Sequence, residues 1–244
     1  MTLSAAHSNA YNNLSFVNHS VDPRTCQYTL GIDLMAVVGN YLLGPNLPLR
    51  LAFNALTPED TGFGKGWTLN LTRYIPTISS LQIHTGEQFH VDGGGAEPTI
   101  REQKLKSFRF LDDGNGEYWV VHRTGMVEHL KVIRSGGLDI AVPHRIYAPS
   151  GRWIELRHEG RFGEHRCLSS IVDRNGLKLL SVTYTNNLIT YHLHPNFGET
   201  RYEIALKDRW VERVTLPSHD RGSWRFKYES NASTQDMTCL TRVE

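Results

Sequence analysis

The 244-residue sequence predicts an all-β protein, built from consecutive antiparallel hairpins that form a large curved sheet. Three observations indicate this class. Period-2 alternation of apolar and polar residues dominates wherever a periodicity is visible. Turn-forming residues separate the alternating runs at short, fairly regular intervals. No window of about ten or more residues carries a helical apolar stripe, and only the segment from Arg101 to Lys106 allows a short helical turn.

Three alternating runs lie between residues 28 and 71, and each predicts a strand with one apolar face. In the run 47–53, the opposite face carries Pro48, Arg50 and Ala52. The apolar positions are Tyr28, Leu30, Ile32 and Leu34, then Leu47, Leu49, Leu51 and Phe53, and finally Trp67, Leu69 and Leu71.

Turn signals then predict a series of hairpins along the rest of the chain. Residues 85–87 (Thr-Gly-Glu) separate the runs 81–84 and 88–91, and residues 112–116 (Asp-Asp-Gly-Asn-Gly) separate 108–110 from 118–121. Residues 123–125 lead into the run 127–132. Further turns are expected at 149–151, 173–176 and 185–187, among predicted strands at 153–156, 188–193 and 224–228.

Two segments near the C-terminus resemble each other and predict an internal repeat. The segments are 153–173 and 224–244, and the spacing from Trp to Cys is 14 residues in the first (Trp153 to Cys167) and 15 in the second (Trp224 to Cys239). We interpret these four residues as a repeated core, in which the cysteines act as small buried apolar side chains. Strand–turn–strand units of this kind bury their apolar faces by stacking. We therefore expect the chain to be part of a longer array.

Composition excludes several classes of function. Lys and Arg number 26 against 25 Asp and Glu, a net charge of +1, which gives no electrostatic basis for binding nucleic acid or an anionic membrane. No apolar stretch reaches the roughly 20 residues of a membrane span. Residues 1–20 are polar and lack the pattern of a secretory signal. Three cysteines, Cys26, Cys167 and Cys239, predict neither a disulfide framework nor a zinc motif.

The glycine-rich block from Gly62 to Trp67 contains Lys65 and invites comparison with a phosphate-binding loop. In such a loop Ser or Thr follows the lysine, and a helix comes next. Here Gly66 follows Lys65, and the next residues predict a strand. We therefore interpret the block as a glycine corner that leads into a strand with a buried Trp67.

Histidines supply the next candidates for chemistry. His192 and His194 lie two apart on a predicted strand and can share a face, as two metal ligands do. No third ligand is identifiable from spacing. The segment with His158, Glu159 and His165 does not match the H-E-x-x-H zinc motif. We therefore expect no metal site.

Acidic and aromatic residues complete the candidates. Asp92, Asp112 and Asp113 could act as acid, base or calcium ligands, but they lie in glycine-rich turns, where Asp bonds its own backbone. We expect no catalytic residue and no cofactor.

Tryptophans exposed on a β face would stack on sugar rings, whereas buried ones would pack the core. A module that binds carbohydrate or a cell-surface receptor is thus the alternative function. The tryptophans concerned are Trp119, Trp153, Trp210 and Trp224.

Three blocks resemble the N-terminal region of RHS/YD-repeat proteins. They are residues 18–28, 42–49 and 62–71, and the Gly-Lys-Gly-Trp sequence of the third is the most specific. The same blocks are similar to those that begin the C component of bacterial insecticidal toxin complexes and related orphan proteins of pseudomonads. The motif residues are Asp22, Pro23, Arg24, Gly44, Pro45, Gly62, Gly64, Gly66 and Trp67.

The resemblance implies a non-catalytic segment of an RHS-type β shell that encloses a C-terminal toxin domain. It divides the chain into a polar arm (1–20), a cap region (21–105) and the start of the hairpin repeats (106–244). Implied partners are the rest of the shell, its toxin cargo and a toxin-complex or secretion component. The chain would be made in the bacterial cytoplasm and delivered by a dedicated route.

Two departures from the family pattern limit what it implies. Cys26 stands where the family has glycine, in a turn where a positive φ is useful. The later repeats, the self-cleavage region and the toxin domain are not in this sequence, so protease and toxin activities are not transferred to it.

Overall fold

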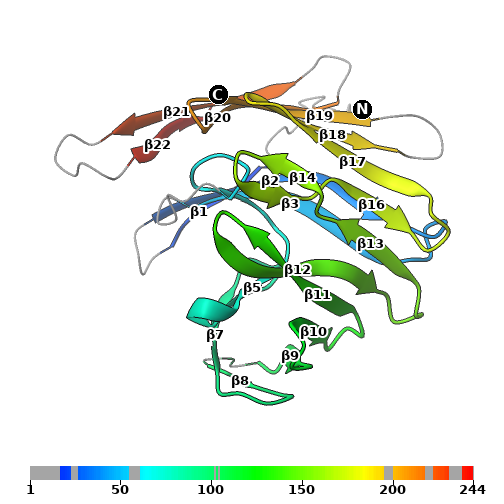
Figure 1. Cartoon of the computed structure of the whole chain (residues 1–244). Helices are drawn as coiled ribbons and strands as arrows, with labels where there is room; N and C mark the ends of the chain where they lie inside the picture. Colours follow the sequence, from blue (N-terminus) through cyan, green and yellow to red (C-terminus); the bar gives the residue numbers. More distant parts are fainter. Residues whose placement is uncertain are drawn as a thin grey trace, which may run out of the picture.

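The computed structural model describes residues 17–22, 27–54, 61–101, 103, 105–194, 200–217, 222–230 and 238–243 (Figure 1). Nearly all of its regular structure is β, as predicted. A single 3-10 turn, η2 (Pro76–Ile78), occurs among these residues. The strands are β1 (Val17–Asp22), β2 (Gln27–Val38), β3 (Asn46–Asn54), β4 (Trp67–Leu69), β5 (Arg73–Ile75), β6 (Ser80–Gln82), β7 (Gln88–Asp92), β8 (Thr99–Ile100), β9 (Phe108–Asp112), β10 (Glu117–His122), β11 (Val127–Ser135), β12 (Leu138–Tyr147), β13 (Trp153–Arg157), β14 (Gly160–Phe162), β15 (His165–Cys167), β16 (Ser170–Asp173), β17 (Lys178–Tyr184), β18 (Leu188–Leu193), β19 (Thr200–Lys207), β20 (Trp210–Thr215), β21 (Ser223–Ser230) and β22 (Thr238–Val243).

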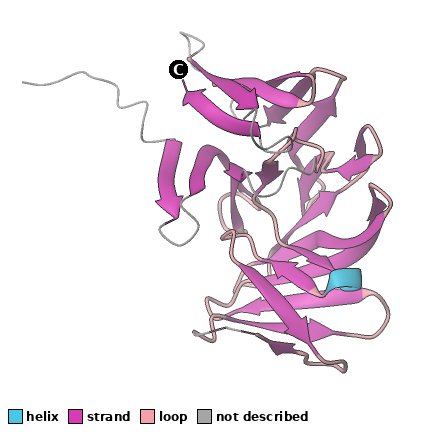
Figure 2. Ribbon diagram, turned by 90° about the vertical axis from the view of Figure 1, so that its left-hand side faces the viewer, coloured by secondary structure: helices cyan, strands magenta, loops and turns pink. Residues whose placement is uncertain are grey.

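A large antiparallel sheet dominates the molecule. It holds 16 of the strands, and from β16 to β22 each strand pairs with the next one in the chain. The meander then continues through β13 and β12 toward β5–β8 and the β9–β11 hairpins. Figure 1 shows that the sheet bends strongly between these two ends, and Figure 2 shows the same strands from the side. This confirms the predicted large curved sheet of hairpins.

A four-stranded sheet, ordered β1-β2-β3-β4, packs against the inner side of the arc. Alternation explains its contact face: Leu47, Leu49, Leu51 and Phe53 are buried, as predicted, while the intervening residues are more exposed. These side chains form one core with apolar residues of β13, β16–β20 and β21. The small sheet therefore fills the concave side of the large one.

A second, smaller core lies where the sheet turns through β5–β12. It contains Tyr74, Phe110 and Tyr118, whose rings lie 4.9–5.6 Å apart between centroids. Residues from both the expected cap region and the expected repeats contribute to it, because β5–β7 pack on β9–β11. We call residues 73–147 the small lobe.

Most turns lie where the sequence predicts them, but the segment 101–106 differs. Its described residues form no helix. The backbone N–H of Arg101 donates to the carbonyl of His90, and the Gln103 amide donates to the carbonyl of Phe108. These bonds hold the segment against strands and replace the i→i−4 bonds of a helix. No helix in the described part of the chain is long and apolar enough to cross a membrane.

Candidate functional site

The glycine block lies where the two sheets meet. Gly62, Gly64 and Gly66 all have positive φ, at 99°, 91° and 77°. Each is also closely packed. A Cβ on Gly62 would collide with Cys167 Sγ, and a Cβ on Gly66 would lie 2.7 Å from a ring carbon of Phe53. Glycine is therefore required here both by conformation and by space. The structure brings together Gly62 and Cys167, which the sequence singled out separately.

Lys65 contacts the large sheet through both its backbone and its side chain. Its backbone N–H donates to the carbonyl of Arg209 (2.8 Å), in the turn between β19 and β20, and its Nζ lies 5.3 Å from the centroid of the Trp210 ring. A β-strand follows the block, not a helix. The block thus ties the small sheet to the large one, and the geometry agrees with a glycine corner.

Trp67 occupies the centre of this junction. Its side chain is fully buried, between the rings of Phe53 (5.3 Å) and Phe226 (5.1 Å). Its indole Nε1 donates to Tyr228 Oη at 2.8 Å, and Tyr228 Oη donates to the carbonyl of Val211 at 2.9 Å. Burial raises the pKa of the Tyr228 hydroxyl, so it stays protonated and able to donate.

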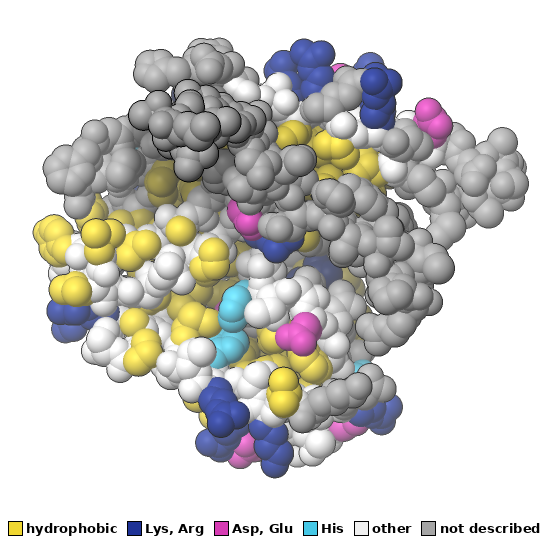
Figure 3. Space-filling model, turned by 180° about the vertical axis from the view of Figure 1, so that it is seen from behind, with side chains coloured by type: hydrophobic (Ala, Val, Ile, Leu, Met, Phe, Trp, Pro, Cys, Tyr) yellow, Lys and Arg dark blue, Asp and Glu magenta, His cyan; other side chains and the backbone are white. Residues whose placement is uncertain are grey.

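A cavity of about 430 Å³ opens beside the corner and has a mainly apolar lining. Its polar side chains include His158, His165 and Cys167. Burial and the nearby His144 lower the pKa of His158 to about 4, against a weaker opposing effect of a bond to the Leu156 backbone. His158 is thus neutral at pH 7. Figure 3 shows apolar side chains, with histidines among them, on the face seen from behind.

The other motif residues lie apart from the corner. Gly44 and Pro45 belong to the loop between β2 and β3, where the backbone N–H of Gly44 donates to the carbonyl of Gly39 (3.0 Å). This loop exposes Tyr41 and Leu42, both with positive φ. Asp22 ends β1, which begins within the expected polar arm. Pro23, Arg24 and Cys26 lie outside the described residues.

The two repeat segments share part of their topology. Trp153 begins β13, which pairs with β16, and Trp224 lies in β21, which pairs with β22. The first segment inserts the separate β14–β15 hairpin, where buried Cys167 lies opposite Gly160. In the second, Cys239 lies in the main ladder opposite Glu229.

The remaining candidates make local contacts. The rings of His192 and His194 lie stacked, 6.4 Å apart, and His194 Nε2 bonds to Ser181 Oγ at 2.7 Å. Asp112 and Asp113 accept backbone N–H bonds within their own turn, as the turn interpretation predicts. Asp92 pairs with Arg101 at 2.6 Å.

The tryptophans considered for sugar stacking each contact a neighbour. Trp119 stacks on His129, with ring centroids 4.1 Å apart. The Arg145 guanidinium lies 4.5 Å from the centroid of Trp153. Trp210 contacts Tyr228 at 4.7 Å, and Trp224 packs against the large core.

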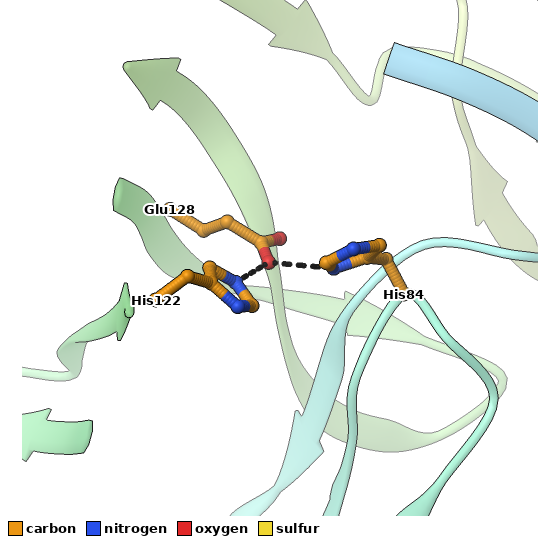
Figure 4. A group of neighbouring side chains, drawn as sticks. All are labelled: His84, His122 and Glu128. Carbon is orange, nitrogen blue, oxygen red and sulfur yellow. Dashed lines mark hydrogen bonds and ion pairs between the residues drawn. The ribbon is translucent and has the colours of Figure 1, made fainter. Parts of the chain in front are cut away.

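A cluster that sequence reasoning missed lies in the small lobe. We call His84, His122 and Glu128 the His–Glu cluster (Figure 4). His122 Nε2 lies 2.6 Å and His84 Nδ1 3.3 Å from Glu128 Oε1. Burial by itself raises the pKa of the Glu128 carboxyl, but bonds from the two histidines outweigh it and bring the pKa to about 2. The cluster therefore holds a buried, ionised carboxylate.

A weak sequence signal for the cluster exists. His122 and Glu128 lie at positions of the period-2 pattern whose neighbours, Val120 and Leu130, are buried core residues. A polar residue on the apolar face of a strand indicates a partner inside the fold. Nothing in the spacing indicates His84, which is 44 positions from Glu128.

The fold and the corner together define a class: an all-β protein in which one large curved sheet of hairpins encloses a smaller sheet on its concave side. No protein-family model and no curated protein matches the sequence. Among solved structures, a chain of the Photorhabdus luminescens Tc holotoxin pore is similar. The TM-score is 0.52 at 12% identity, over 87% of this chain and 16% of that chain.

A chain in the crystal structure of TcdB2–TccC3 also matches, with a TM-score of 0.47 at 12% identity over 93% of this chain and 16% of that one. The protein thus spans a small part of the length of both chains. The holotoxin match shows that this chain has the fold of a segment of a Tc toxin component.

Proposed function

We propose that the chain is a non-catalytic structural segment of a shell that encloses a toxin polypeptide. One observation carries the proposal: the meander of hairpins in the 16-stranded sheet. Over 87% of the present chain, this fold is similar to 16% of a Tc holotoxin chain. A sheet built by adding hairpins can be extended strand by strand into a wall. Its partners would be the rest of the shell, the enclosed cargo and a delivery component.

The proposed action is steric. The large core and the four-stranded sheet fill the concave side of the arc, so this segment would close part of the shell. In the complete shell, strand pairing along the meander would leave few free edges for aggregation. The protein would be made in the bacterial cytoplasm and reach its target through the delivery component.

The gene beyond codon 244 provides the test. The expected result is further hairpin repeats followed by an unrelated C-terminal domain. In the full-length product, that domain should resist limited proteolysis, whereas the same domain expressed alone should be cleaved. A stop codon at this point, or equal cleavage of the domain in both forms, would contradict the shell function and favour a free-standing binding module.

A further inference from the structure

We propose that the His–Glu cluster is a binding site for one Zn²⁺ ion, with His84 Nδ1, His122 Nε2 and a Glu128 carboxylate oxygen as ligands. The donor atoms of the three side chains all lie within 4.8 Å of one another. This inference is independent of the proposed shell function.

The ligand set suits zinc. Two imidazoles and one carboxylate are a recurrent set of three protein ligands for Zn²⁺, with water in the fourth position. Bond lengths of about 2.0–2.2 Å in a tetrahedral site separate ligand atoms by roughly 3.3 Å. The His84–Glu128 separation already equals this value, and the His122–Glu128 pair at 2.6 Å needs only a small outward movement.

Three separate elements fix the cluster. His122 ends β10 and Glu128 lies near the start of β11, and because Val120 pairs with Glu128, His122 is its diagonal neighbour on the same face. His84 comes from the turn between β6 and β7. A zinc ion would therefore join this turn to the β10–β11 hairpin, and would stabilise the small lobe.

A fourth residue orients the ligands. Thr72 is fully buried, and its hydroxyl donates to Glu128 Oε1 (2.9 Å) while accepting the backbone N–H of His84 (3.1 Å). Such support around a ligand is typical of metal sites. It holds the carboxylate and the His84 backbone in place whether or not an ion is bound.

The ion also has a route of entry. The side chains of His122 and Glu128 are 9% and 2% exposed, whereas that of His84 is 25% exposed. The cluster is therefore closed on the strand side and open at the turn. A water molecule on the metal would face that opening.

The test uses the whole chain, stripped with a chelator and titrated with ZnCl₂ in a calorimeter, with Co²⁺ absorption as a report of tetrahedral geometry. We expect one equivalent of metal per chain and a rise in Tm with Zn²⁺ concentration. His84→Asn, at the most exposed ligand, and Glu128→Gln, which keeps the side-chain shape, should each weaken binding more than about 100-fold. Thr72→Val removes a supporting residue and not a ligand, so it should lower the affinity for Zn²⁺ by about 10–100-fold. The loss of a ligand should therefore cost more affinity than the loss of Thr72.

Matched controls separate this site from other histidines. His90→Asn alters a half-exposed histidine on neighbouring β7, and a His192→Asn/His194→Asn double variant removes the stacked pair. Both should bind Zn²⁺ like the unaltered chain, and circular dichroism should show that all variants fold. Absence of binding by the unaltered chain, or unchanged binding by folded His84→Asn and Glu128→Gln, would overturn the proposal.

Discussion

Two tyrosines of the large core, the buried Tyr191 and the partly buried Tyr228, differ in the hydrogen bonding of their hydroxyl groups. Tyr228 Oη accepts from Trp67 and donates to the Val211 carbonyl. Tyr191 Oη has no partner among the described residues, although its side chain is fully buried. Removing a hydroxyl that bonds a buried donor costs stability, whereas removing an unsatisfied one does not.

Tyr228→Phe should therefore lower the free energy of unfolding by about 1–3 kcal/mol, because Trp67 Nε1 is left without its acceptor. Tyr191→Phe should leave that free energy unchanged or raise it by about 1 kcal/mol. Urea unfolding of both variants beside the unaltered chain measures the difference. Equal losses in the two variants would show that the bonds at the Trp67 junction do not stabilise it.

His158 should make stability depend on pH. Its pKa falls from the ordinary 6.5 to about 4 in the folded chain. Between these values the unfolded chain binds a proton at His158 and the folded chain does not. Stability from this group is thus complete above pH 6.5 and is lost as the pH falls toward 4. The free energy of unfolding should fall by on the order of 2 kcal/mol. This is less than the whole pKa shift corresponds to, because the His158 side chain is partly exposed to solvent.

The measurement is the urea midpoint between pH 7 and pH 4 for His158→Gln and for His90→Gln. His158→Gln should flatten the pH dependence, since glutamine does not titrate. His90→Gln, on an exposed strand position, should keep the slope of the unaltered chain. If the urea midpoint of His158→Gln depends on pH as steeply as that of the unaltered chain, other titratable groups cause the pH dependence.

At the scale of elements, the glycine corner makes a specific prediction. Gly66→Ala and Gly86→Ala both place a side chain at positive φ, which costs about 1 kcal/mol in each case. Only at Gly66 does the new methyl collide with Phe53; at Gly86 nothing lies within 4 Å. Gly66→Ala should therefore lose about 1–3 kcal/mol more than Gly86→Ala in denaturant unfolding. If the two variants lose similar amounts of unfolding free energy, the backbone of the corner can shift enough to accommodate the methyl group beside Phe53.

The same corner shows how far sequence reasoning reaches. Alternation places Leu47, Leu49 and Leu51 on one buried face, and glycine spacing identifies a corner before Trp67, because both depend on neighbouring residues alone. The contact of Gly62 with Cys167 depends instead on how the two sheets stack.

The candidate zinc site and the repeats show the same limit. His84 joins the cluster only because β5–β7 pack on the β10–β11 hairpin, which local spacing does not encode. In the repeats, the similar Trp-to-Cys spacings of 14 and 15 residues predict similar units. Cys167 nevertheless lies in the separate β14–β15 hairpin, whereas Cys239 lies in the β21–β22 ladder.

At the scale of the whole molecule, the two ends of the large sheet determine how the chain can associate with another chain. Within the described residues, β22 ends the sheet at one side and β8 ends its main path at the other. A strand at a sheet edge offers its backbone to another chain. A segment of a shell would meet its neighbour at such an edge, so the isolated chain should pair there with a second copy.

Sedimentation velocity over a range of concentrations should therefore show association of the isolated chain. Val243→Lys places a charge on β22, where lysine at an edge opposes pairing, and should shift the equilibrium toward monomer. Leu105→Lys is the control: Leu105 is also exposed but lies outside any strand. A chain that stays monomeric at all concentrations argues against a wall-forming edge. If Leu105→Lys reduces association as strongly as Val243→Lys does, the contact is a general apolar one and β22 does not carry it.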